Sequence, residues 1–402
     1  MSAESKQTGR SNTDLRKLNL SYVLSQVHYA NSTTRSEITK ATGLNRSTVL
    51  TLLDSLEKRG LVIQGSKSDH SDIGRPSMSV NASQSVVSFA VLPRLNELNL
   101  GVVGFDGSII TQARLPLKTG TTPETASSMA AEWIENIRKT LPAETLISGV
   151  GVAAAGAIKT LSGEIRLAPS LGWSETAFKE LLSEKIQLPV AIDNDAGLWC
   201  SAEQKFGVGR GHQHMLLLIG VNGGLGGGAV VNGQLVRGQD GYAGEFGHMR
   251  ISDKTQKDYS GIPGTLEAMV RREDIIKTLG AGSISDAQLF ELVESSKSKK
   301  LEAVLNEQTK YLGRAIGVLL NAFNPEILVL AGFLELFVNF RKEQLIREIS
   351  SQSLPFAAEN LLIVRGTRGN DLLMVGTAEL GFEGLIRNPL KYPLTKASSL
   401  TN

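Results

Sequence analysis

The sequence predicts an α/β protein in which a small N-terminal domain of three helices and two strands precedes a larger body. Beyond residue 85, strand-like and helix-like segments alternate, as in a layered α/β fold. Residues 12 to 81 contain three helical segments and then two strand-like ones. The 402 residues allow two to four domains of roughly 100 to 200 residues each. More than one function can therefore share the chain.

The composition is that of an ordinary globular protein. Apolar residues make up 41% and charged residues 20% of the chain, which excludes a disordered or collagen-like protein. No apolar run approaches the roughly 18 to 20 residues of a membrane helix. The start of the sequence lacks the apolar core of a secretory signal, so we expect a cytoplasmic protein with no membrane partner. The single cysteine, Cys200, excludes an intrachain disulfide and any zinc site with two or more thiolates.

Positive charge is concentrated in the N-terminal fifth of the chain. Residues 1 to 81 hold 11 Lys and Arg against 7 Asp and Glu, whereas the remainder holds 31 against 33. This asymmetry is typical of a nucleic-acid-binding domain attached to a neutral body.

Residues 12 to 60 predict three helices. The first has one apolar stripe, formed by Leu20, Val23, Leu24 and Val27. A shorter helix is expected from Ser36 to Ala41, and Gly43 permits the tight turn that follows it. Asn45 has the side chain of a good N-cap, so the third helix is expected to begin there.

The third helix has an exposed polar face. Its apolar face consists of Val49, Leu52, Leu53 and Leu56. The opposite side and the first turn carry the candidate DNA contacts Arg46, Ser47, Thr48 and Thr51. Such side chains hydrogen-bond base edges in a major groove, where an arginine can reach guanine O6 and N7. Strands at 61–64 and up to residue 80 predict a hairpin wing that includes Arg75. The alternative is a domain of the same shape that binds protein.

In the body, the ends of the expected strands are candidate ligand positions. These strands are at 86–92, 98–105, 147–153, 190–192, 215–221 and 327–330, with a helix at 124–141. The strand at 190–192 leads into Asp193, Asn194 and Asp195. A carboxylate there could accept a proton from a sugar hydroxyl that attacks a phosphoryl group, although an Asx turn would give the same tripeptide.

Two further polar residues lie three positions apart, which lets them face the same ligand. They are Glu245 and His248, and the alternative is that they only satisfy each other. The side chain of Asn194 has a donor and an acceptor, which suits a sugar hydroxyl.

Six segments occur in this order along the chain: TTRSEITKATGLNRSTVLTLLDSLEKRGLV followed by GRP, then GVGVAAAGAI, LAPSLGW, LPVAIDNDAG, LLLIGVNGGLGGGAVVNG and GYAGEFGHM. Together they resemble the ROK family of repressors and sugar kinases. The resemblance implies an N-terminal winged helix-turn-helix, with Arg75 in or near the minor groove. It also implies two actin-like or hexokinase-like lobes of ribonuclease H-like fold with a sugar cleft between them.

The implied domains are 1–82 for DNA binding, 83–195 for the first lobe and 196–402 for the second lobe with a dimerisation surface. The segment at about 372–388 is expected to return to the first lobe. In the family the position of Asp195 is the general base. The implied sugar contacts are Ser170, Asn194, Asp195, Glu245, His248 and Glu267, although Ser170 replaces the usual asparagine.

Departures from the family pattern favour a regulator over an enzyme. Leu92 to Asn96 replace the Asp-x-Gly-Gly-Thr loop that holds ATP phosphates and magnesium in the kinases. The second phosphate loop has Asn222, Gly223 and Gly224 without a hydroxyl, and the adenosine loop has Ala331 and Gly332.

The zinc site of the family is also lost. Its three cysteine positions hold Asp258, Ser260 and Thr265, so that only His248 remains and no metal is expected. We expect His248 to be free to serve the sugar alone, and the loop from 252 to 264 to be mobile or held by ordinary packing.

The sequence thus predicts a sugar-responsive DNA-binding regulator, most often a repressor in this family, without a cofactor. Its expected partners are operator DNA, a sugar or sugar phosphate, and further copies of itself in a homodimer or homotetramer. The first alternative is an active ATP-dependent sugar kinase that carries a DNA-binding domain. The second is a constitutive scaffold whose cleft binds nothing.

Overall fold

The computed structural model describes residues 12–30, 32–67, 78–221, 224–367 and 371–400. Contacts within the chain divide it into two compact units, each of which collects segments distant in the sequence. Unit 1 contains Met1–Ala153, Ala177–Ile192 and Thr377–Asn402, and unit 2 contains Ala154–Thr176 and Asp193–Gly376. The N-terminal domain and the first part of the body therefore lie together in unit 1. The C-terminal segment from Thr377 also belongs to it.

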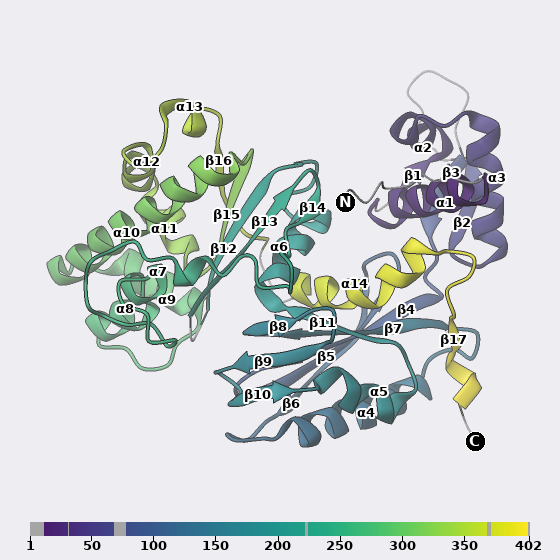
Figure 1. Ribbon diagram of the computed structural model, residues 1–402, viewed down its shortest axis with the longest axis horizontal. Helices are drawn as coiled ribbons and strands as arrows, with labels where there is room; N and C mark the ends of the chain where they lie inside the picture. The colour runs from purple at the N-terminus through teal and green to yellow at the C-terminus, as the bar shows by residue number, and fades with distance from the viewer. Residues whose placement is uncertain (1–11, 31, 68–77, 222–223, 368–370, 401–402) are drawn as a thin grey trace, which may run out of the picture. The chain divides into compact units, whose positions relative to one another are not determined.

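The N-terminal domain has three helices and a hairpin in the predicted order (Figure 1). Its elements are α1 (Asn12–His28), β1 (Thr33–Thr34), α2 (Arg35–Thr42), α3 (Arg46–Lys58), β2 (Val62–Lys67) and β3 (Met78–Ala82). The three strands form a sheet in the order β1-β3-β2. The sequence did not predict β1, nor the capping box in which Thr34 and Glu37 begin α2.

The helices meet in a small apolar core. The residues predicted for it are all buried: Leu20, Val23, Leu24, Val27, Val49, Leu52, Leu53 and Leu56. Asn45 caps α3 as predicted, because its Oδ1 accepts a hydrogen bond of 2.8 Å from the backbone N–H of Thr48. Gly43 has a φ of +68°, a left-handed conformation that glycine adopts without strain. These local features fix the direction in which α3 faces.

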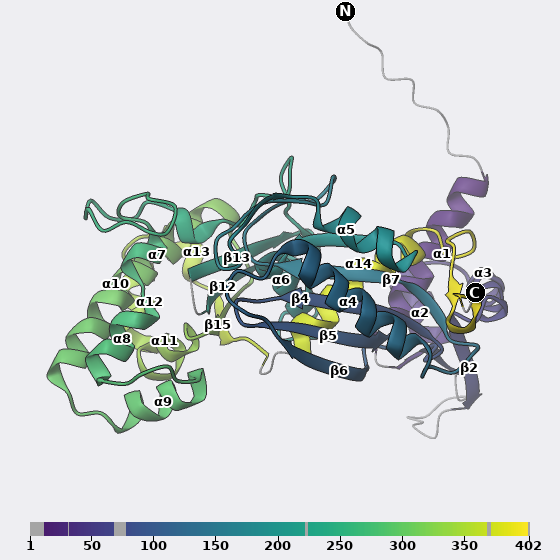
Figure 2. The same ribbon diagram turned by 90° about the horizontal axis from the view of Figure 1, so that it is seen from below.

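The sheet of unit 1 is mixed. Strand β4 (Val86–Pro93) pairs antiparallel with β5 (Glu97–Gly104) and parallel with β7 (Leu146–Ala154). The full order is β11-β7-β4-β5-β6, with β17 paired to β7. The remaining elements are β6 (Ile109–Pro116), β11 (Val190–Asn194), β17 (Thr395–Lys396), α4 (Pro123–Arg138), α5 (Phe178–Ile186), α14 (Asp371–Arg387) and η2 (Ala397–Leu400). Only the part of α14 from Thr377 onward belongs to unit 1. Figures 1 and 2 show α4 and α5 side by side along this sheet.

Unit 2 has two sheets. A small antiparallel sheet consists of β8 (Ala157–Lys159), β9 (Glu164–Ala168) and β10 (Trp173–Thr176). The larger sheet has the order β14-β13-β12-β15-β16. Its strands are β12 (Met215–Val221), β13 (Gly224–Val231), β14 (Gln234–Leu235), β15 (Ile327–Gly332) and β16 (Leu362–Arg365). The strands predicted for the body agree with the observed ones to within two residues, whereas the strand predicted at 61–64 extends to Lys67.

The helices of unit 2 pack around its larger sheet. They are α6 (Asp195–Phe206), η1 (Phe246–His248), α7 (Leu266–Met269), α8 (Arg272–Leu279), α9 (Asp286–Ser295), α10 (Lys299–Phe323), α11 (Glu335–Phe340), α12 (Lys342–Ser350) and α13 (Pro355–Ala358). One apolar core joins β12, β15 and α10 through residues such as Leu216, Leu328 and Leu312. Among the described helices, none combines the length and apolar character that a bilayer crossing needs.

Candidate functional site

Four of the predicted sugar contacts come together within unit 2. Asp195 is the first residue of α6, Glu245 precedes η1, His248 ends η1, and Glu267 lies in α7. Burial raises the pKa of Glu245, and the carboxylates of Asp195 and Glu267 raise it further. The imidazole of His248 lowers the pKa of Glu245. We call Asp195, Glu245, His248 and Glu267 the carboxylate-histidine cluster.

Glu267 faces the start of strand β13. Burial raises the pKa of its carboxyl group, whereas the backbone N–H of Leu225 lowers it by donating a hydrogen bond of 2.8 Å to Oε2. A Cβ atom on Gly224 would collide with this carboxylate. Glu267, Gly224 and Phe333 also line a pocket of about 350 Å³. The side chain of Glu267 therefore already accepts the backbone N–H of Leu225, next to Gly224.

Asn194 and Asp193 hold the beginning of α6 in place. The Oδ1 of Asn194 accepts a hydrogen bond from Gly197 N at 3.0 Å, and its Nδ2 donates one to Gly156 O at 2.8 Å. Asp193 is buried and pairs with Arg237, whose Nε lies 2.9 Å from Oδ2. The Asn194 amide thus serves as an N-cap and retains one hydrogen and one lone pair for a ligand.

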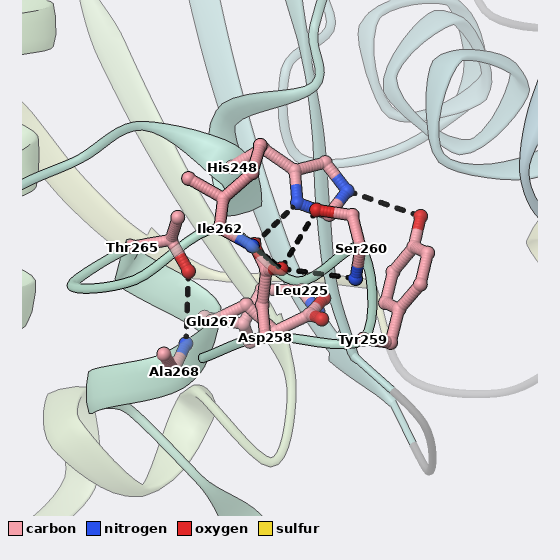
Figure 3. Close-up of polar contacts among 9 residues, drawn as sticks. All are labelled: Leu225, His248, Asp258, Tyr259, Ser260, Ile262, Thr265, Glu267 and Ala268. Atoms are coloured by element: carbon pink, nitrogen blue, oxygen red, sulfur yellow. Dashed lines mark hydrogen bonds and ion pairs between the residues drawn. The ribbon is translucent and has the colours of Figure 1, made fainter. Parts of the chain in front are cut away.

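A hydrogen-bonded carboxylate holds the loop in which the family resemblance places the lost zinc site. His248 Nδ1 lies 2.8 Å from Asp258 Oδ2 (Figure 3). The other oxygen, Oδ1, accepts hydrogen bonds from Ser260 Oγ at 2.7 Å and from Ile262 N at 3.0 Å. Burial raises the pKa of Asp258, but the hydrogen bonds outweigh this effect and lower it to about 2. Asp258 is therefore the centre of a network that closes the loop.

The second nitrogen of His248 is also occupied. The Tyr259 hydroxyl lies 3.0 Å from Nε2, and its ring packs edge-on against the imidazole. Burial raises the pKa of Tyr259 to about 12, with smaller contributions from Glu245 and Glu267. The expectation that His248 is free of structural partners is therefore wrong, because Asp258 and Tyr259 replace the lost metal site around it. Within the described residues, no group of three or more His, Cys, Asp or Glu could hold a metal ion.

The segment that replaces the first phosphate loop is a closed hairpin turn. Pro93 and Leu98 are paired across β4 and β5, and the backbone N–H of Arg94 donates to Glu97 O at 2.8 Å. The side chain of Leu95 is exposed at the tip of the turn. The amide of Arg94 is therefore already used within the hairpin.

The remaining predicted residues lie apart from the cluster in the sequence and have different surroundings. Ser170 is in the turn between β9 and β10 and is half-buried. On α3, Arg46, Ser47 and Thr51 are exposed and Thr48 is half-buried. Two of their hydroxyls have local partners, since Ser47 Oγ donates to Asn45 Oδ1 at 2.8 Å and Thr51 Oγ1 donates to Ser47 O at 3.0 Å. The predicted wing contact Arg75 lies outside the described residues.

The fold is that of a winged helix-turn-helix domain followed by a body with the hexokinase-like fold of sugar kinases. The ROK family model matches residues 96–382, and the chain belongs to this family.

Three relatives indicate how far the similarity extends. A xylose repressor from Bacillus spizizenii is 24% identical over 374 residues, which are 92% of this chain and 96% of that repressor. A glucokinase from Halalkalibacterium halodurans is 31% identical over 57% of this chain and 74% of its own length. The crystal structure of a ROK family transcriptional regulator, a homologue of the E. coli MLC protein, has a TM-score of 0.72 at 18% identity, covering 94% of this chain and 98% of its own. The repressor match is long enough to include much of the N-terminal domain.

Proposed function

We propose that this protein is a DNA-binding transcriptional repressor that responds to a sugar bound at the carboxylate-histidine cluster. The observation that carries the proposal is the similarity to a xylose repressor over 92% of the chain, which includes much of the N-terminal domain. That domain contacts operator DNA, and the body senses the sugar. The sugar changes repression by binding the two states of the protein with different affinity.

Helix α3 supplies the surface that reads DNA. Its buried side packs into the domain core, so Arg46, Ser47 and Thr51 face outward from the other side. A helix of this kind enters the major groove, where an arginine makes two hydrogen bonds to one guanine. Arg75 belongs to the same proposal as a minor-groove contact. One such domain makes few base contacts, so two copies bind a two-fold operator as a homodimer or homotetramer.

The cluster has the chemistry of a carbohydrate site. Carboxylates accept hydrogen bonds from sugar hydroxyls, and bonds to charged groups are stronger than neutral ones. Burial raises the pKa values of both Glu245 and Glu267, and the neighbouring carboxylates of Asp195 and Glu267 raise that of Glu245 further. We take D-xylose as the first candidate effector because the related repressors are named for it.

We further propose that the protein does not phosphorylate its sugar. The hairpin turn at Arg94 to Glu97 uses the backbone amide that a phosphate loop would present. The Glu267 carboxylate accepts the backbone N–H of Leu225, which directly follows Gly224. Both features disfavour a nucleotide, because its phosphates need free amides and a positive potential.

Thermal-shift titration of the full-length protein tests the proposal. The titration would compare D-xylose, D-glucose, N-acetylglucosamine and, where they exist, the 6-phosphates of these sugars. Saturation at 100 times the dissociation constant should add about 2.7 kcal/mol to the free energy of unfolding. The stabilising sugar should also release operator DNA that has been selected from a random pool.

Two results would contradict the proposal. Formation of ADP when the sugar and ATP are present together would show that the protein is an active sugar kinase. If no sugar shifts the melting temperature while the selected DNA still binds, the protein would be a constitutive DNA-binding scaffold.

A further inference from the structure

His28 links the N-terminal domain to the body within unit 1. It is the last residue of α1, it is 1% exposed, and its ring stacks on Phe105 with centroids 4.1 Å apart. Its Nδ1 lies 2.5 Å from Phe105 O, and its Nε2 lies 2.7 Å from Glu379 Oε1. Both ring nitrogens of His28, at the end of α1, thus make hydrogen bonds to oxygen atoms of the body.

Glu379 also contacts the residue that follows His28. Burial raises the pKa of Tyr29, and the carboxylates of Glu379 and Glu383 raise it further, with a hydrogen bond between Tyr29 and Glu379. Glu379 itself is only 5% exposed. A buried carboxylate needs such partners, because an isolated charge in the interior is very costly. The contact is therefore specific in geometry as well as in charge.

A second contact joins the end of α3 to the segment after α14. Arg59 Nη2 donates a hydrogen bond of 2.7 Å to Tyr392 O, and the Tyr392 hydroxyl donates one of 3.0 Å to Ser148 O. The ends of α1 and α3 are therefore both attached to the C-terminal part of the chain. Since α3 carries the proposed base contacts, this attachment determines where they point.

Helix α14 itself is fixed on the sheet of unit 1. The Ser148 hydroxyl donates to Gly381 O at 2.6 Å. Any Cβ on Gly151 would collide with the backbone of Thr377, and a Cβ on Gly149 would lie 3.5 Å from Gly381 Cα. Such close backbone contact leaves the helix little freedom to shift without the sheet.

The first turns of α14 belong to unit 2 and contact α6. A Cβ on Gly376 would lie 2.8 Å from Ala202 Cβ and 2.9 Å from Leu198 O. Helix α6 begins at Asp195, one turn before Leu198. Glu379 lies one turn after Gly376 on α14. One helix thus contacts the element that starts at the carboxylate-histidine cluster and also holds the N-terminal domain.

We propose that Glu379 is a positioning residue that sets the direction of the DNA-binding domain, and that α14 conveys movement of α6 to it. The first part stands on the contacts of His28 and Tyr29. The second part rests on the proposed function, because it requires a sugar to act on the start of α6. Close-packed contacts of this kind have discrete arrangements, so that a small shift at one end is passed on as a change of packing.

Half-site spacing provides a readout that simple loss of stability would not change. Full-length Glu379→Gln and Glu379→Ala would be compared with wild type on selected operator DNA whose two half-sites are moved apart one base pair at a time. Wild type should prefer one spacing, because two-fold DNA-binding proteins match half-site geometry. Both variants should lose this preference, by about tenfold at the best spacing, while binding to a single half-site is retained.

Asp371→Asn is the matched control, since it removes the charge of an exposed carboxylate at the start of the same helix, α14. It should keep the spacing preference. The positioning role is overturned if Glu379→Gln keeps the wild-type preference. It is equally overturned if Glu379→Gln binds single and paired half-sites with the same proportional loss.

Gly376→Ala tests the contact between α14 and α6. Calorimetry with D-xylose should give an affinity close to that of wild type, while the sugar concentration that releases operator should rise about tenfold. Release at the wild-type concentration would overturn the conveying role of α14. If D-xylose does not bind to wild type, the proposed effector fails, and the spacing experiment still decides the role of Glu379.

Discussion

His248 and Asp258 are joined by a hydrogen bond of 2.8 Å between Nδ1 and Oδ2, across a loop of ten residues. The zinc site that the family resemblance implies would need a cation to draw a histidine and three thiolates together. Here the Asp258 carboxylate forms hydrogen bonds with an imidazole, with hydroxyl groups and with backbone N–H groups. Because the partners of an anion are donors, the same loop closure is achieved with the opposite sign of charge.

Metal analysis of protein purified without added zinc should find no stoichiometric zinc. Chelator should leave the unfolding midpoint unchanged, because Asp258 and Ser260 occupy two of the positions that thiolates would need. Inductively coupled plasma mass spectrometry and thermal melts with EDTA are the measurements. About one zinc per chain would show that ligands other than His248 exist.

Acid should weaken the loop in a defined pH range. The pKa of Asp258 is lowered from 3.8 to about 2 in the folded protein, so its stabilising contribution is complete above about pH 4. That contribution is lost as the pH falls toward 2. Urea unfolding between pH 2 and pH 6 should show a smaller decrease in stability for Asp258→Asn than for wild type. Asp253→Asn changes an exposed carboxylate of the same loop and should match wild type. Parallel curves for all three proteins would contradict this role.

Removal of the Tyr259 hydroxyl should strengthen sugar binding. In the structure this hydroxyl occupies His248 Nε2, so a sugar hydroxyl must displace it to use that nitrogen. A net hydrogen bond contributes about 1 kcal/mol, so Tyr259→Phe should bind D-xylose about fivefold more tightly by calorimetry. Tyr242→Phe, in the segment before η1, is the control and should leave the affinity unchanged. Weaker binding by Tyr259→Phe would make the tyrosine a contact of the sugar instead of its competitor.

Loss of either acid in the cluster should abolish the response to sugar and spare operator binding. Charge-assisted hydrogen bonds contribute roughly 1.5 to 3 kcal/mol, so Asp195→Ala and Glu245→Ala should each cost at least about tenfold in affinity. The variants should stay on operator at sugar concentrations that release wild type. Glu291→Ala, an exposed acid on α9, is the control. Unchanged sugar affinity in both variants would place the ligand elsewhere.

Arg46→Ala should weaken binding to selected operator DNA by roughly 1 to 3 kcal/mol if the arginine contacts a guanine. Lys58→Ala, at the opposite end of α3, should have a smaller and sequence-independent effect. Fluorescence anisotropy at ~50 and ~200 mM salt would separate the two roles, because phosphate contacts make binding salt-dependent. Equal loss on operator and random DNA would make Arg46 a phosphate contact.

Local signals in the sequence were sufficient for the N-terminal domain. The stripe from Leu20 to Val27, the cap at Asn45 and the turn at Gly43 act over a few residues, and each lies where it was predicted. Strand β1 was missed because two residues carry no periodicity. It forms only because Thr33 pairs with Val80, far along the chain.

The candidate site was less accessible to sequence reasoning. Asp195 and Glu245 are far apart in the chain, and only the family resemblance suggested that they meet. The role of Asp258 was missed because its position was considered only as a lost metal ligand. Its value as an acceptor depends on His248 and Ser260 turning toward it. His28 and Glu379 are 351 residues apart in the sequence, and no short sequence pattern predicts their contact.

The proposed absence of kinase activity, which the closed turn at Arg94 to Glu97 supports, has a consequence for how the body senses its sugar. A kinase consumes its sugar, so its occupancy follows the rate of supply and the amount of ATP. A body that only binds returns each molecule unchanged, and its occupancy depends on concentration alone. Operator and sugar must then weaken each other's binding by the same factor. A cell with many free operator copies would therefore need more sugar for the same degree of release, and dilution of the sugar would restore repression without new protein.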